Sequence, residues 1–248
     1  MKYKEYGKGN QKTIVLLHGG GLSWWNYRDV AELLQNDYHV ILPILDGHAG
    51  SDRSFTTIED NAAEIIDFIR SDLGGSVWLL GGLSLGAQVA LEMLSQQGDI
   101  CEHAIIESAA IVPSMVTYAM IKPSITCSYG LIKQKWFTRI QFRSLKIKNE
   151  LYDDYYRDTC AVSKEDMIAF LRANTSYTLK ESVKYSTADM RIYYGDKETR
   201  GIKKSAEKIK EMLPSATVIE LKGMVHGDFS INHPEDYVKA IKSWSDNR

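Results

Sequence analysis

The five residues Gly82-Leu83-Ser84-Leu85-Gly86 carry the strongest chemical signal in this sequence. The apolar run at 77–80 before them is typical of a buried strand, and 85–97 after them has the apolar spacing of a helix. On such a sharp turn, glycines without a Cβ allow the serine hydroxyl to stand out at the end of the sheet. The start of the helix also favours negative charge that develops there. We therefore predict that Ser84 is a nucleophile; the alternative is a glycine-rich turn that only packs the helix on the strand.

A serine hydroxyl needs a neighbouring base, because it is a weak nucleophile at neutral pH. Among six histidines, His226 follows the last predicted strand, residues 217–221. Catalytic groups gather at the carboxyl ends of parallel strands, so we predict that His226 is the general base. The remaining histidines are expected to be structural or to shape nearby loops: His18, His39, His48, His103 and His233.

A third group must orient this base, and we predict that it is Asp196 in Gly195-Asp196-Lys197-Glu198. Asp196 follows the predicted strand 190–194, and the resulting chain order is nucleophile, acid, base. A Gly-Asp pair is also common in simple turns. Glu107, which follows the predicted strand 101–106, is the main rival, and Glu198 is a weaker one.

Acyl transfer also requires amide donors for the oxyanion. We expect one from Leu85, directly after the serine, and one from Gly20 in His18-Gly19-Gly20-Gly21, with Gly21 as the next choice. Three residues are expected to contact the substrate: Gly21, Trp24 and Leu83.

The elements that position these residues alternate between strand and helix. Short apolar runs at 13–17, 38–44, 77–80 and 101–106 are separated by segments with helical spacing, which favours a mainly parallel sheet covered by helices. The alternation stops over 111–185, where only helical stretches follow, and it resumes at 190–194 and 217–221. We therefore predict a core domain formed by 1–110 and 186–248, interrupted by a helical cap at 111–185.

The cap segment contains many aromatic residues and a basic stretch. Most of the aromatics are expected to form the cap's own core, and a few to face the cleft. The basic residues could meet anionic lipid headgroups or a charged leaving group such as coenzyme A, but a solvated helix face is the preferred interpretation. They are Lys133, Lys135, Arg139, Arg143, Lys146 and Lys148.

Composition restricts the class of partner. The chain has 248 residues, a formal charge of −2 and 44% hydrophobic residues, which gives no indication of nucleic-acid binding. Three widely spaced cysteines and a charged start favour a cytoplasmic protein without a disulfide framework. We expect a small-molecule ester or acyl substrate, no stable membrane insertion, no metal or organic cofactor, and a monomer or homodimer.

Taken in order, the motifs resemble those of the α/β-hydrolase superfamily. They are the His-Gly-Gly-Gly turn, Asp-Gly-His-Ala-Gly-Ser at 46–51, the Ser84 pentapeptide, Tyr-Gly-Asp-Lys-Glu at 194–198 and the late Gly-x-x-His. The resemblance implies an α/β-hydrolase fold with a helical cap inserted after strand 6. It also implies a serine hydrolase that cleaves carboxylic esters of small or medium acyl chains through an acyl-enzyme. Thioester hydrolysis, carbon–carbon bond hydrolysis and non-catalytic ligand binding are the alternatives, because one fold hosts many functions.

Overall fold

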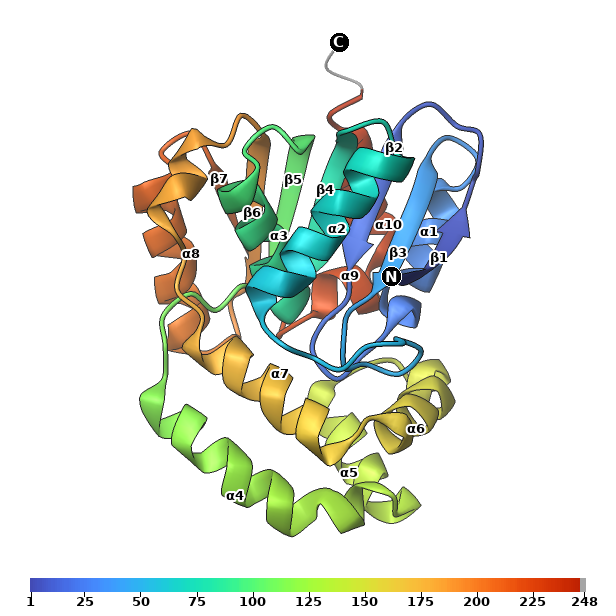
Figure 1. The fold of residues 1–248 in the computed structure, drawn as a ribbon, viewed down its shortest axis with the longest axis vertical. Helices are drawn as coiled ribbons and strands as arrows, with labels where there is room; N and C mark the ends of the chain where they lie inside the picture. The colour runs from blue at the N-terminus through green and yellow to red at the C-terminus, as the bar shows by residue number, and fades with distance from the viewer. Residues whose placement is uncertain (246–248) are drawn as a thin grey trace.

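A seven-stranded, mainly parallel sheet forms the centre of the computed structural model, which describes residues 1–245 (Figure 1). The strand order is β1-β3-β2-β4-β5-β6-β7, and only β1 runs antiparallel to its neighbour, β3. The strands are β1 (Lys2–Tyr6), β2 (Thr13–Leu17), β3 (His39–Ile44), β4 (Val77–Leu83), β5 (Cys101–Glu107), β6 (Asp189–Gly195) and β7 (Thr217–Leu221). The predicted α/β class with a mainly parallel sheet is confirmed.

Helices cover both faces of this sheet, and the side chains of each strand alternate between two apolar cores. Along β2, Ile14 and Leu16 pack on one face with α1 (Arg28–Leu34) and α10 (Pro234–Lys242). Val15 and Leu17 pack on the other face with α2 (Ile58–Asp72), α3 (Leu85–Gln96) and α8 (Arg200–Met212). Burial on both faces explains why the central strands are continuous apolar runs. Figure 1 shows α2 and α3 in front of the sheet and α1 and α10 behind it.

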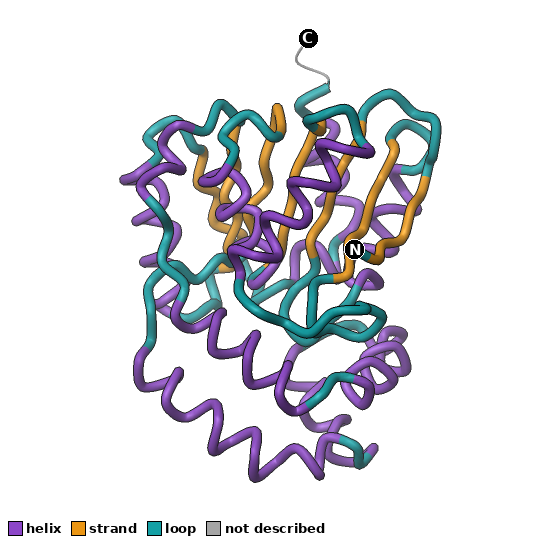
Figure 2. The backbone as a smooth tube through the Cα atoms, in the orientation of Figure 1, coloured by secondary structure: helices purple, strands orange, loops and turns teal. Residues whose placement is uncertain are grey.

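A helical insert leaves the sheet after β5 and returns at β6. It contains α4 (Met115–Ile132), α5 (Lys135–Leu145), η2 (Asn149–Leu151), α6 (Tyr152–Ala161), α7 (Lys164–Ser176) and η3 (Glu181–Tyr185). The insert was expected after a sixth strand, but five strands, β1 to β5, precede it in this chain. Figure 2 shows the loops at the carboxyl ends of the strands lying between the sheet and the insert.

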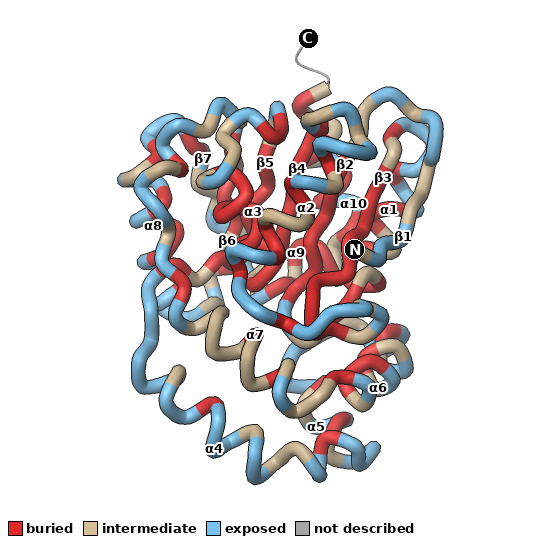
Figure 3. Tube along the Cα trace, viewed as in Figure 1, coloured by how far each residue is buried: buried red, intermediate tan, exposed pale blue. Residues whose placement is uncertain are grey.

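Three short elements were not predicted. β1 is a polar, largely exposed edge strand, so it lacks the apolar pattern of the others. The tryptophan segment forms the 3₁₀ helix η1 (Trp24–Tyr27), and α9 (Asp228–Asn232) is a single helical turn after the His226 loop. Figure 3 shows the contrast between the buried central strands and the mostly exposed trace of α4. No helix within 1–245 is both long enough and apolar enough to cross a membrane.

Candidate active site

Ser84 lies on a strained turn between β4 and α3. Its backbone φ of +54° and ψ of −110° are unusual for a residue with a side chain. The flanking glycines make this turn possible. A Cβ on Gly82 would lie 2.3 Å from the carbonyl oxygen of Gly86, and a Cβ on Gly86 would lie 2.1 Å from that of Leu17. The Ser84 amide donates a 2.9 Å hydrogen bond to the Glu107 carbonyl, which fixes the turn to the end of β5.

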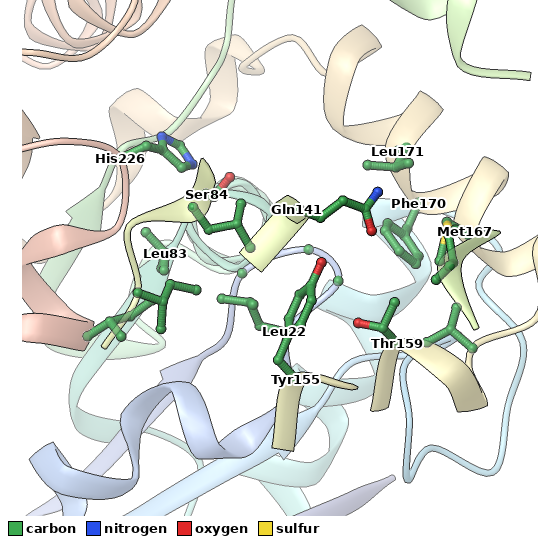
Figure 4. A pocket seen from close by; sticks show the side chains of 18 of the residues that line it. Leu22, Leu83, Ser84, Gln141, Tyr155, Thr159, Met167, Phe170, Leu171 and His226 are labelled. Atoms are coloured by element: carbon green, nitrogen blue, oxygen red, sulfur yellow. The ribbon is translucent and has the colours of Figure 1, made fainter. Parts of the chain in front are cut away.

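Ser84 and His226 line one cavity of about 230 Å³ between the sheet and the insert. His226 comes from the loop between β7 and α9, so two segments far apart in the chain meet at the carboxyl edge of the sheet. Figure 4 shows the imidazole beside the serine hydroxyl at one end of the cavity. No hydrogen bond joins these two side chains in the described structure. Looser contacts of this kind are common in ligand-free sites.

The His226 ring is held by Glu198. Its Nδ1 lies 2.7 Å from Glu198 Oε2; the histidine side chain is 49% exposed and the glutamate 1%. Because an ionised carboxylate can only accept hydrogen bonds, Nδ1 carries the proton. The Nε2 lone pair is therefore available to accept a proton from another group.

Three donors converge on Glu198. Besides His226, its carboxylate accepts hydrogen bonds from the Gly195 amide at 2.9 Å and the Ser108 hydroxyl at 2.7 Å. Burial disfavours its charge, but the hydrogen bonds from His226, the Gly195 amide and Ser108 lower the pKa of Glu198 below its usual value. Glu198 is thus a buried, ionised carboxylate. Ser108, at a backbone φ of +56°, is a supporting residue that sequence reasoning missed.

The expected pairing of Asp196 with His226 is wrong. Asp196 Oδ1 accepts a 2.8 Å hydrogen bond from the Gly223 amide instead. The chain turns at Gly195, where the Glu198 amide bonds back to the Gly195 carbonyl, and this turn directs the Glu198 side chain toward His226. Glu107, the other rival, is buried beneath the site and contacts the Ser230 amide at 3.3 Å.

The glycine turn after β2 leaves one amide available in the middle. The Gly19 amide donates to Asn26 Oδ1 at 3.1 Å, and the Gly21 amide donates to His48 Nε2 at 3.0 Å. Within the described residues, the amides of Gly20 and Leu85 donate no hydrogen bond. These two amides belong to turns that border the same cavity as Ser84.

Two buried neutral histidines hold this glycine turn. His18 Nδ1 contacts the Gly19 carbonyl at 2.9 Å, and its Nε2 accepts from the Leu45 amide at 3.1 Å. Burial and the adjacent His48 lower the pKa of His18 to about 3, and burial lowers that of His48 to about 4. Both rings are therefore uncharged at neutral pH and act as fixed hydrogen-bonding supports, and neither can serve as an additional cation.

Two of the three residues expected to contact the substrate lie at the cavity. Gly21 and Leu83 line the cavity, but Trp24 does not. Trp24 starts η1, and its ring lies 5.2 Å from the Lys4 ammonium, on the side of β1. Trp25 is buried, and its indole donates to Asp158 of α6 at 2.8 Å, so it ties the insert to the core.

The insert supplies the remaining wall of the cavity. Of the aromatic residues in the insert, Tyr155 and Phe170 line the cavity. Most other lining side chains are aliphatic, but Gln141 and Thr159 also line the cavity, and the buried Gln141 side-chain oxygen has no hydrogen-bond partner among residues 1–245. Figure 4 shows these two side chains with Tyr155, away from the His226 end. The cavity is therefore mainly apolar, with Ser84 at one end and the polar side chains of Gln141 and Thr159 among its other lining residues.

Comparison with known proteins gives one family. The model of the alpha/beta hydrolase family matches residues 14–240. Epoxide hydrolase 3 of Xenopus tropicalis is 27% identical over 183 residues, which are 68% of this chain and 49% of that protein. The chain spans about half the length of the curated relatives it matches.

Solved structures share the fold at low sequence identity. An esterase from Thermogutta terrifontis superposes with a TM-score of 0.79 at 16% identity, over 99% of this chain and 93% of its own. An enol-lactonase from Burkholderia xenovorans gives 0.79 at 14% identity, over 98% and 95% of the two chains. At these identities the likeness establishes the fold and not the substrate.

Proposed function

We propose that this chain, which belongs to the alpha/beta hydrolase family, is a serine hydrolase. Its expected substrates are carboxylic esters with small or medium acyl chains. One observation carries the proposal. Ser84, on its strained turn, and His226, held by the buried carboxylate of Glu198, border one apolar cavity. Nucleophile, base and orienting acid are the three groups that acyl transfer through serine requires.

In the first step, His226 Nε2 takes the proton from Ser84 as the serine oxygen attacks the ester carbonyl. The imidazolium that forms is stabilised by Glu198, which stays ionised because several donors surround it. Glu198 therefore takes the role that the sequence assigned to Asp196. His226 next protonates the leaving alcohol, and water then releases the acyl group by the reverse sequence of proton transfers.

The tetrahedral oxyanion would be bound by the amides of Gly20 and Leu85. Support comes from the neighbouring amides: Gly19 and Gly21 already donate to Asn26 and His48, which leaves Gly20 available. The Leu85 amide begins α3, so the helix dipole adds to its effect. Removing one such donor typically costs about 3 kcal/mol of barrier.

The cavity favours a short, mainly apolar acyl group. Its volume of about 230 Å³ lies below the roughly 300–1,000 Å³ typical of pockets for drug-sized ligands. The buried side-chain oxygen of Gln141 would gain a partner from a substrate that carries a hydroxyl group on this chain. An unpaired buried polar atom is costly, so such a substrate is favoured over a purely aliphatic one.

Thioesters and carbon–carbon bonds next to a carbonyl could react through the same groups, so the type of bond is tested directly. Initial rates on p-nitrophenyl acetate, butyrate and octanoate are compared with rates on the matching acyl-CoA thioesters. We expect hydrolysis of the esters, with butyrate preferred over octanoate. Faster turnover of the thioesters would replace the ester proposal.

The identity of the nucleophile is tested by fluorophosphonate labelling and by Ser84→Ala. The reagent is expected to modify Ser84, and the alanine variant to lose both labelling and ester hydrolysis. If Ser84→Ala keeps the wild-type rate, the proposed mechanism is wrong. If the folded wild-type chain reacts with no ester, thioester or phosphonate, a ligand-binding role takes its place.

A further inference from the structure

The outer face of the helical insert exposes an unusual number of apolar side chains. Within residues 1–245, eight of the eleven large hydrophobic side chains that are exposed lie between positions 112 and 145. Val116 is 78% exposed and Trp136 is 59% exposed. We define the outer face as the exposed sides of α4 and α5; its most exposed apolar residues are Met115, Val116, Met120, Trp136 and Ile140.

Helix α4 is apolar on two opposite sides. Ile121 and Ile132 are buried toward the body of the protein, and Ile132 lines the cavity. On the opposite side, exposed apolar residues recur with helical spacing at 116, 120, 123, 127 and 131. A helix that is apolar all round is normally buried on all sides. The exposed side of α4 is therefore expected to meet a further apolar medium or surface.

The charges on this face are of one sign. All seven charged residues between 108 and 148 are Lys or Arg, in a chain whose formal charge is −2. Lys148 forms an ion pair with Asp29, but the other six form none within the described residues. Instead Lys133, Lys135 and Arg139 lie over tyrosine rings, at 5.6, 5.6 and 4.9 Å. Asp153 borders the hollow that contains Arg139 and Arg143. Its one negative charge does not offset the positive charges, so the face stays positive.

We propose that this outer face docks on the surface of an anionic lipid bilayer. Exposed aliphatic groups and a tryptophan can enter the boundary between headgroups and acyl chains, while the surrounding Lys and Arg side chains contact lipid phosphates. A second copy of the chain fits less well, because it would place two faces of like charge together. Nucleic acid would use the cations but leave the apolar side chains without a partner.

The outer face and part of the cavity wall are two sides of the same helices, α4 and α5. The opposite sides of α4 and α5 supply cavity walls, including Ile125, Ile132 and Gln141. A bilayer bound to the outer face would therefore lie one helix layer away from the cavity. Docking itself does not depend on the proposed ester hydrolysis, and it can be measured with a catalytically inactive chain.

The test is sedimentation of the full chain with vesicles of phosphatidylcholine alone or mixed with phosphatidylglycerol. We expect binding to the mixed vesicles that weakens as salt is raised. Arg139→Gln with Arg143→Gln should bind about 30-fold more weakly, since each cation near an anionic surface contributes roughly fivefold. Val116→Ser with Ile140→Ser should also bind more weakly, because it removes only apolar contacts.

The matched control is Lys204→Gln with Lys208→Gln, which removes two exposed charges from α8. It should bind like the wild type, as should Ser84→Ala. Phosphonate labelling of Ser84 should be unchanged in both outer-face variants, as evidence that they are folded. Equal binding by the α8 and α5 charge variants would overturn the proposal. So would no binding to phosphatidylglycerol vesicles, or a dimer that covers α4 and α5 in solution.

Discussion

Replacing Glu198 by Gln tests the assignment of the orienting acid, and Asp196→Asn is its matched control. Each change removes one negative charge from the same turn and keeps the shape of the side chain. Only Glu198 contacts the imidazole, at 2.7 Å from His226 Nδ1, whereas Asp196 contacts the Gly223 amide. We expect Glu198→Gln to lose most activity and Asp196→Asn to stay within about threefold of the wild type, because an amide oxygen can still accept from Gly223.

The size of the loss follows from two effects at Glu198. The charged hydrogen bond to His226 is lost, and such bonds contribute about 1.5–3 kcal/mol. A glutamine can also present its NH₂ group to Nδ1, which would move the ring proton to Nε2. The ring could then no longer accept a proton from Ser84, and in serine triads this wrong tautomer lowers kcat about 10⁴-fold. Because the His226 side chain is 49% exposed, solvent weakens the electrostatic contribution. We therefore expect a loss of about 10³-fold in kcat/KM, or about 4 kcal/mol.

The assay is the initial rate on p-nitrophenyl butyrate, with the rate of phosphonate labelling of Ser84 as a second readout. Thermal unfolding followed by circular dichroism establishes that both variants are folded. The reasoning is refuted if kcat/KM falls about 10³-fold in Asp196→Asn and stays near the wild-type value in Glu198→Gln. Equal small effects in both variants would likewise exclude Glu198 as the group that orients the base.

Three other predictions concern the turn, the buried carboxylate and the cavity. Gly82→Ala should lower the free energy of unfolding in urea by at least about 2 kcal/mol, because its Cβ would lie 2.3 Å from the Gly86 oxygen; a neutral effect would contradict the steric argument. Burial raises the pKa of Glu107 from 4.5 to about 7, so the folded state holds a proton that the unfolded chain releases. Stability should therefore fall by about 3 kcal/mol as pH rises through this window, and Glu107→Gln should remove that slope in denaturation series between pH 5 and 8. Gln141→Leu with Thr159→Val should shift the ratio of kcat/KM about tenfold toward butyrate over hydroxybutyrate esters, since two polar side chains leave the cavity; an unchanged ratio would show that these side chains do not select the substrate.

The sequence was sufficient for the central strands and the Ser84 turn because their patterns are local. A short apolar run bounded by turn residues specifies a buried strand, and β7 has the predicted bounds. The glycines at 82 and 86 are required by contacts within the turn and with β2, which a strand-turn-helix pattern implies. β1 was missed because an exposed edge strand needs no apolar alternation, and its pairing with β3 is not visible in the local sequence.

The acid and the outer face depended on information that is not local. Asp196 and Glu198 are two residues apart in one turn, and only the path of the chain after Gly195 decides which carboxylate reaches His226. Similarly, the basic stretch alone suggested a solvated helix. The structure adds that apolar side chains such as Val116 and Ile140 are exposed among those cations. Exposure of this kind depends on which side of each helix packs on the body of the protein.

The two glutamates near the site also differ in ionisation, for a reason that their positions in the sequence do not reveal. Each lies at or just after the end of a strand, and each is about 1% exposed, so burial opposes the charge of both. Glu107 accepts a 3.3 Å hydrogen bond from the Ser230 amide, and its contacts with Ser230 do not offset burial, so its pKa rises. Glu198 receives three hydrogen bonds of 2.7–2.9 Å, which outweigh burial and lower its pKa. Because only an ionised carboxylate can stabilise an imidazolium, the arrangement of donors, and not distance along the chain, favours Glu198 as the partner of His226.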